Sequence, residues 1–232
     1  MANFVSTHQS ASSSAIATLL KSVYLQMAAA LSVTGIVAYF LSQSPAFWQT
    51  LSTNPSLIWI TLIAQFGLVI WLSARIYRMS MGTATVLFIL YSVLMGVTMS
   101  SIFMVYTMGS IASTFFITAG TFLAMSIIGF VTRLDLSRIG SILLMALIGL
   151  IIASVVNIFL HSETLYWIVS FAGVLIFVGL TAYDTQKIKE MVANYGVADD
   201  MGHKLALFGA LTLYMDFVNL FLHLLRILGN RD

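Results

Sequence analysis

The sequence predicts an all-α membrane protein with seven transmembrane helices. Of its 232 residues, 60% are hydrophobic and only 8% are charged, and the mean hydropathy is +1.01. A soluble domain carries about 25% charged residues, so this chain has too few to cover a surface that faces water. Its apolar stretches run unbroken for about 20 residues or more, whereas the strands of a membrane barrel alternate over about 10 residues. These observations exclude an ordinary soluble enzyme and favour helices over a barrel.

The charge-free stretches set the number of spans, because one helix needs about 20 apolar residues to cross a bilayer. The first two stretches are long enough for two helices each and the other three for one each: residues 22–74, 79–132, 139–162, 164–183 and 205–225. Pro45 and Pro55, the only prolines, mark a turn inside the first stretch. The last stretch crosses only if Asp216 is accepted near its middle. The expected count is seven.

The first 20 residues differ from the rest of the chain. They are rich in serine, and the first basic side chain is Lys21, which follows the serines. This order is unlike a secretory signal or an arginine-rich transit peptide. We therefore expect residues 1–20 to form a mobile cytoplasmic tail and residues 21–232 to form a single seven-helix transmembrane domain.

The basic residues predict the orientation. Eight of them precede the first span or lie in loops that share its side of the membrane: Lys21, Arg75, Arg78, Arg133, Arg138, Lys187, Lys189 and Lys204. The opposite side has only Arg226 and Arg231, after the last span. By the positive-inside rule, the N-terminus of this multi-pass protein is expected in the cytoplasm. An odd number of spans places the C-terminus outside.

Composition also excludes several kinds of partner and cofactor. The chain has no cysteine, which excludes disulfides, thiolate catalysis and cysteine-based metal sites. Its net charge of +2 is too small to indicate a nucleic-acid partner. No cofactor is expected.

An ionisable side chain inside a span is costly and usually marks a pathway, a relay or a paired interior site. Asp216 is the strongest such signal. Thr212, Asp216, Asn219, His223 and Arg226 follow one another at spacings of four, three, four and three residues, which places them on one stripe of the last helix. A stripe with a carboxylate should face away from lipid, so this helix is expected inside the bundle. The alternative is a structural ladder of hydrogen bonds between helices.

Asp184 is the second candidate, at the cytoplasmic end of the span before the last loop. Its ordinary interpretation is an ion pair with Lys187, one turn later. Because the last two spans run in opposite directions, Asp184 and Asp216 are also expected to face one cytoplasm-side cavity. Two carboxylates in a poorly hydrated site cannot both ionise cheaply, so they should share a proton and titrate together. Such a pair would sense pH.

Two basic residues, Arg75 and Arg78, close the second span on the same side. An arginine at a helix end commonly anchors the helix in the headgroup layer. The alternative role for one of them is a counter-charge for the aspartate pair.

Two segments carry a resemblance to a known family. They are Gly-Leu-Thr-Ala-Tyr-Asp-Thr-Gln-Lys at residues 179–187 and Gly-Ala-Leu-Thr-Leu-Tyr-Met-Asp-Phe-Val-Asn-Leu-Phe at residues 209–221. The sequence resembles the Bax-inhibitor, or transmembrane BAX-inhibitor-motif, family, and in particular its bacterial inner-membrane branch. The resemblance implies seven helices, with the last at the centre and six around it.

The resemblance also implies roles for particular residues. Asp184 and Asp216 match a hydrogen-bonded aspartate pair whose protonation is linked to a calcium leak. An arginine at the end of the second span acts as a latch in that family, and here Arg75 and Arg78 straddle the expected place. Some members have an acidic residue in the second span where this chain has Gln65.

The first function hypothesis is a pH-responsive ion leak with calcium as the expected ion. Calcium prefers oxygen ligands, and Asp184 and Asp216 supply the only anionic oxygens expected in the spans, so they are the candidate transient calcium ligands. The partners are then the lipid bilayer, calcium and protons. The alternative is a non-conducting regulator that binds another membrane protein, such as a membrane-anchored protease. An enzyme is not expected, since intramembrane aspartyl proteases have Gly-x-Gly-Asp where this chain has Leu-Tyr-Met-Asp at 213–216.

Overall fold

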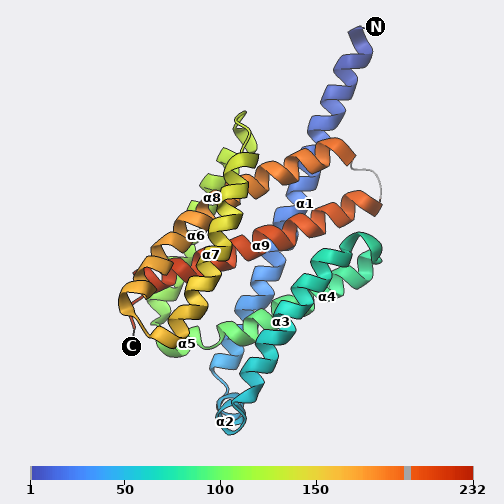
Figure 1. Ribbon diagram of the computed structural model, residues 1–232. Coiled ribbons are helices and arrows are strands. Elements are labelled where there is room, and N and C mark those ends of the chain that lie inside the picture. Colours follow the sequence, from blue (N-terminus) through green and yellow to red (C-terminus); the bar gives the residue numbers. More distant parts are fainter. Residues whose placement is uncertain (1, 196–199, 232) are drawn as a thin grey trace. The chain divides into compact units, whose positions relative to one another are not determined.

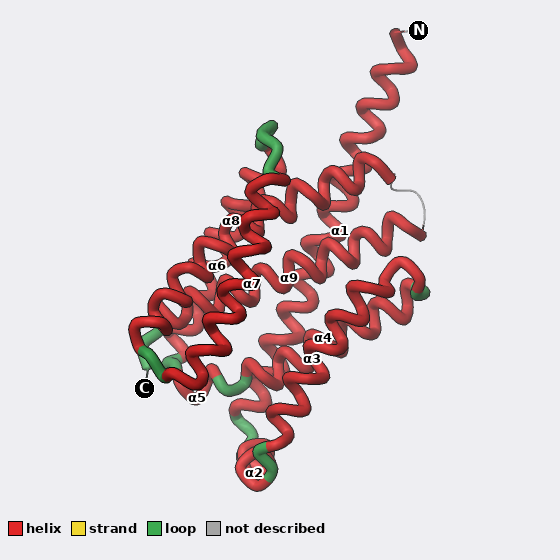
Figure 2. Tube along the Cα trace, viewed as in Figure 1, coloured by secondary structure: helices red, strands yellow, loops and turns green. Residues whose placement is uncertain are grey.

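The computed structural model describes the backbone of residues 2–195 and 200–231, and the side chains of residues 17–193 and 202–231. Helices joined by short loops make up almost all of this part of the chain (Figure 2). Within it, seven helical segments are long and apolar enough to cross a membrane: Ala17–Ser42, Ser56–Arg78, Met81–Val105, Met108–Val131, Ser137–Leu160, Glu163–Ala193 and Gly202–Leu228. The prediction of an all-α membrane protein with seven spans is confirmed.

The chain divides into two units (helices labelled in Figure 1). The first contains α1 (Ala2–Ser42), α2 (Pro45–Thr53), α3 (Ser56–Arg75), the 3₁₀ helix η1 (Ile76–Arg78), α4 (Met81–Met99) and α5 (Ile102–Val105). The second contains α6 (Met108–Val131), α7 (Ser137–Leu160) and α8 (Glu163–Tyr195) as far as Lys189. The long helix α9 (Asp200–Leu228) belongs to the first unit up to Tyr214 and to the second from Met215.

In the first unit, α4 packs against both α1 and α3. The connection between the first two spans contains both prolines, as predicted. Ser44 caps α2, because its hydroxyl oxygen accepts a hydrogen bond from the Phe47 N–H at 3.4 Å. Pro45 occupies the first turn, where a missing N–H leaves no hydrogen bond unmade.

Tyr214 anchors the first half of α9 in this unit. Its fully buried hydroxyl lies 2.7 Å from Thr34 Oγ1 of α1, which also donates toward the Ser92 carbonyl of α4 at 2.9 Å. The rings of Phe88 and Tyr91 meet the Tyr214 ring edge-on, with centroids 5.7 and 5.9 Å away. One tyrosine thereby joins three helices through both its apolar and its polar parts.

The helix α9 is the most enclosed of the seven spans. In its most apolar window 72% of the residues are buried, whereas the other six spans range from 6% to 44%. In the second unit, Phe217 of α9 lies between Phe115 and Phe122 of α6, with centroids 5.5 and 5.4 Å away. This burial agrees with the interior place expected from the polar stripe. The arrangement of six helices around α9 stays a prediction from the family resemblance.

The N-terminal part of the chain is helical from Ala2, continuous with the first span. The candidate span itself begins at Ala17. The side chains of residues 2–16 and all of residue 1 lie outside the described part. The expected mobile, cytoplasmic character of residues 1–20, and the single domain 21–232, therefore stay predictions.

Candidate functional site

Both aspartates lie inside spans. Asp216 is near the middle of Gly202–Leu228 and only 5% of its surface is exposed. Asp184 lies within Glu163–Ala193, eleven residues before the end of α8. The sequence prediction ended this span at residue 183, because the charges that follow interrupt the apolar run. That end is wrong: α8 continues as a helix beyond Asp184, whose side chain is largely sheltered within it.

The carboxyl groups of Asp184 and Asp216 lie close enough to interact with each other. Oδ2 of Asp216 is buried and has no hydrogen-bond partner among the described residues. Lys187 places its ammonium 5.8 Å from the centre of the Tyr183 ring and acts on Asp184 only through its charge. The close partner of Asp184 is therefore the second carboxyl group.

Two glycines of neighbouring helices hold the segment that leads to Asp184. Gly129 of α6 packs directly on the backbone of Ala182, and Gly140 of α7 packs directly on the ring of Tyr183. A Cβ atom at either position would collide with α8. Small residues let helices in a membrane approach this closely. Both α6 and α7 therefore contact α8 at the two residues before Asp184.

Gln186 fixes the segment that follows Asp184. Its Nε2 donates to the Leu134 carbonyl at 2.8 Å, and its Oε1 accepts from the Leu136 N–H at 2.9 Å. Both acceptor and donor belong to the turn between α6 and α7. Because the two bonds satisfy both ends of one buried amide, they tie α8 to this turn just beyond the aspartate.

The polar stripe of α9 does not form a hydrogen-bonded ladder between the described helices. Thr212 and Asn219 donate to carbonyls one turn earlier in α9 itself, at 3.0 and 2.8 Å. The buried His223 ring stacks on Phe177 of α8, with centroids 5.7 Å apart, and its Nδ1 has no partner among the described residues. Arg226 lies over an aromatic ring of α8. Among the described residues of the second unit, Asp216 is the member of this stripe that interacts with a carboxyl group of another helix.

The arginines of the proposed latch lie at the end of the second span. Arg75 is the last residue of α3 and Arg78 the last of η1, and both side chains are exposed. They belong to the first unit, whereas the aspartates belong to the second, so the latch stays a prediction. Gln65 is buried between α3 and α4, where its Oε1 accepts from Thr98 Oγ1 at 3.0 Å.

The donor set of the pair consists of two carboxyl groups. The described part of the chain contains no group of three or more His, Cys, Asp or Glu side chains that could hold a metal ion. Calcium takes six to eight oxygen ligands, and Asp184 and Asp216 supply two carboxyl groups. A passing ion would have to keep several waters.

Comparison with known proteins identifies the family. The family model described as inhibitor of apoptosis-promoting Bax1 matches residues 16–232. The chain belongs to this Bax-inhibitor family. Inner membrane protein YbhL of Escherichia coli K12 is 52% identical over 215 residues, which cover 92% of each chain. Uncharacterized proteins of Borreliella burgdorferi and Rickettsia prowazekii are 46% and 44% identical, covering 91% and 90% of this chain and 91% and 88% of theirs.

Membership in the Bax-inhibitor family confirms the resemblance read from residues 179–187 and 209–221. Together with the seven spans, it makes this chain a multi-pass membrane protein. The name of the Escherichia coli relative places that protein in the inner membrane.

Proposed function

We propose that this protein is a pH-responsive ion leak of the inner membrane, with calcium as the permeant ion and the Asp184–Asp216 pair as its sensor. The observation that carries this proposal is the direct contact of two carboxyl groups inside spans, one of them almost fully buried. A structural role does not need a carboxylate there, because Asn or Thr would bond between helices at a much lower cost of desolvation.

The charge of the pair would control the passage of cations. Two neighbouring carboxyl groups are more stable with one shared proton than fully ionised, because two negative charges repel at short range. A pair with one proton carries one negative charge and attracts a cation. In the proposed mechanism a second proton neutralises the pair, releases the arginine latch at Arg75 or Arg78 and opens the cytoplasmic mouth.

The unpartnered Oδ2 of Asp216 supports a role in binding. A buried carboxyl oxygen without a hydrogen bond is costly and uncommon. An oxygen in this state can accept a proton, a water molecule or a hydrated cation. Calcium fits this chemistry, because it is a hard cation that prefers carboxylate and water oxygens.

Calcium flux in liposomes tests the proposal. Purified protein is reconstituted with a trapped calcium dye, and the initial flux is measured from about pH 5 to about pH 8. We expect the wild-type flux to change across this range, and Asp216→Asn and Asp184→Asn each to flatten the profile. Asp135→Asn is the matched control, since Asp135 is an exposed aspartate in the turn between α6 and α7.

Two outcomes would overturn the proposal. Wild-type liposomes that leak no more calcium than empty liposomes would favour the non-conducting regulator. A wild-type profile that Asp216→Asn and Asp135→Asn leave equally unchanged would remove the aspartate pair as the sensor. The variants Arg75→Gln and Arg78→Gln, measured in the same way, test the latch separately.

A further inference from the structure

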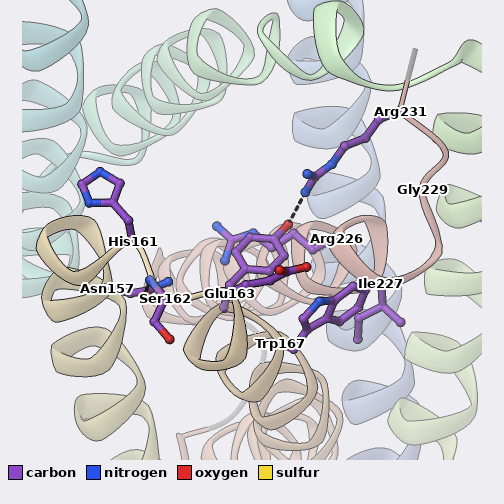
Figure 3. A pocket seen from close by; sticks show the side chains of 10 residues that line it. Asn157, His161, Ser162, Glu163, Trp167, Arg226, Ile227, Gly229 and Arg231 are labelled. Atoms are coloured by element: carbon purple, nitrogen blue, oxygen red, sulfur yellow. Dashed lines mark hydrogen bonds between the residues drawn. The ribbon is translucent and has the colours of Figure 1, made fainter.

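A pocket of about 590 Å³ opens in the second unit where α7 ends, α8 begins and α9 ends. Its volume lies in the range of small-molecule binding sites. Figure 3 shows Asn157 and His161 on one side of it and Arg231 on the other. Arg226 also lines it. Neither Asp184 nor Asp216 is among the described residues that line this pocket.

The C-terminal segment fixes Arg231 at this pocket. The backbone of Arg231 pairs with Tyr106 as an isolated β-bridge, and the preceding Asn230 N–H donates to Ser110 Oγ at 2.9 Å. The Arg231 guanidinium donates to the Tyr166 hydroxyl at 2.7 Å, the bond drawn dashed in Figure 3. It also lies 5.8 and 5.6 Å from the ring centres of Tyr106 and Tyr166. These contacts hold the Arg231 side chain at the pocket.

The second cation of the pocket is Arg226, in the last turn of α9. Its guanidinium lies 5.8 Å from the centre of the same Tyr166 ring. The Tyr166 ring therefore makes a cation–π contact with each of the two arginines. Both guanidinium groups are charged, because arginine does not lose its proton in proteins. Neither guanidinium has an ion pair with a carboxylate of a described residue. Among the described residues that line the pocket, Glu163 is the one acidic side chain, beside two arginines.

Asn157 adds a neutral hydrogen-bond donor to the two arginines of the pocket. Asn157 Oδ1 accepts from the Ser162 N–H at 3.0 Å, which closes the end of α7. Its Nδ2 group is thereby left to donate to a ligand. Guanidinium and amide donors fit an oxyanion such as a phosphodiester.

The place of the pocket in the fold indicates the source of that anion. The three spans end or begin at Leu160, Glu163 and Leu228, so the pocket lies at the level where helices leave the apolar layer. Tyr166 and Trp167 line it, and these residue types are enriched at the membrane interface. A phospholipid presents its phosphodiester at this level, with its chains beside the helices.

We propose that this pocket binds the phosphate group of a phospholipid headgroup, with Arg226 and Arg231 as the cationic ligands and Asn157 as a further donor. Tyr166 is a positioning residue, because it holds Arg231 by a hydrogen bond and offers its ring to both guanidinium groups. Glu163 is an acceptor for a hydroxyl group of the headgroup.

Native mass spectrometry of the full-length protein in detergent, titrated with phosphatidylglycerol, tests the proposal. We expect Arg226→Gln/Arg231→Gln to weaken the binding of the first lipid about tenfold. The control is Arg133→Gln/Arg138→Gln, which removes the same charge from exposed arginines at the other end of α7. It should change the affinity by less than about twofold.

Each outcome bears on the site. Equal weakening by both double variants would overturn the proposal, because it would reduce the effect to general attraction between positive protein and negative lipid. Inorganic phosphate that binds as tightly as the lipid would overturn the lipid source. Should the double variant fail to fold, Tyr166→Phe decides. It preserves every charge and removes the acceptor of Arg231, so an unchanged lipid affinity would contradict the proposal.

Discussion

No side chain separates Gly129 of α6 from the backbone of Ala182 in α8. This contact lies two residues before Asp184, so the approach of the two helices and the placement of the carboxyl pair depend on the same glycine. A Cβ at residue 129 would meet backbone atoms, which cannot rotate aside as a side chain would.

Gly129→Ala should therefore destabilise the protein by about 1–3 kcal/mol, the usual cost of forcing an extra group into a packed interior. The free energy of unfolding, measured by titration with dodecyl sulfate in mixed micelles, checks this value. Gly120→Ala is the matched control in α6, because a Cβ at residue 120 meets nothing within 4 Å. Equal stability of the two variants would show that α6 and α8 do not approach at Gly129.

Tyr214→Phe should lower the free energy of unfolding by about 0.5–1.5 kcal/mol, because it removes one buried hydrogen bond and leaves the ring contacts in place. Thr34→Val removes the partner hydroxyl. In a double-mutant cycle the two losses should be less than additive, since each variant breaks the same bond. Tyr39→Phe, on an exposed ring of α1, is the control and should be neutral. Additive losses would show that Thr34 and Tyr214 do not interact.

Gln186→Leu should loosen the turn between α6 and α7, because the Leu136 N–H loses the oxygen that it donates to. We expect the Leu136 amide to exchange its hydrogen about tenfold faster, as measured by hydrogen–deuterium exchange mass spectrometry. Gln186→Glu retains an oxygen acceptor for that N–H but cannot donate to Leu134 when ionised. It should protect the Leu136 amide better than Gln186→Leu. Unchanged exchange in both variants would show that Gln186 does not hold the turn between α6 and α7.

Asp135 should make a pH-dependent contribution to stability. Hydrogen bonds from the side chain and the backbone N–H of Ser137 hold the pKa of this exposed carboxyl below its ordinary value of 3.8. A lowered pKa in the folded state means that the stabilisation is present at neutral pH and is lost as the pH falls through that pKa. The thermal midpoint of Asp135→Asn should lie below that of the wild type near pH 7, and the gap should close toward about pH 3. A gap that widens on acidification would contradict this assignment.

The number of spans was predictable because it depends only on the length of apolar stretches. The end of α8 was not, because a charge near a helix end is normally in water, and here Asp184 has a buried partner instead. The glycines that position it could not be singled out either. Gly129 and Gly140 touch α8, whereas Gly120 and Gly149 of the same helices meet nothing, and only tertiary packing makes this difference.

Asp184 and Asp216 could be named as candidates because carboxylates are rare in apolar stretches. The pocket at the ends of α7, α8 and α9 was missed. In the sequence, Arg226 and Arg231 indicate orientation, and Arg226 also belongs to the polar stripe of the last span. The bridge between Tyr106 and Arg231 joins residues that are far apart in the sequence. The sequence around Arg231 shows no local pattern that would indicate such a partner.

The order of α8 and α9 along the chain has a consequence for biosynthesis. An aspartate near the middle of a helix disfavours its entry into the bilayer by about 2.5–3.5 kcal/mol on insertion scales, and α9 carries Asp216 there. Its carboxyl partner lies on α8, and the ring beneath His223 lies on α8 as well. Because α9 is synthesised after α8, its partner residues on α8 are available when α9 leaves the ribosome. The order of α8 and α9 thus lets the span that carries Asp216 enter the membrane after the helix that holds its partner.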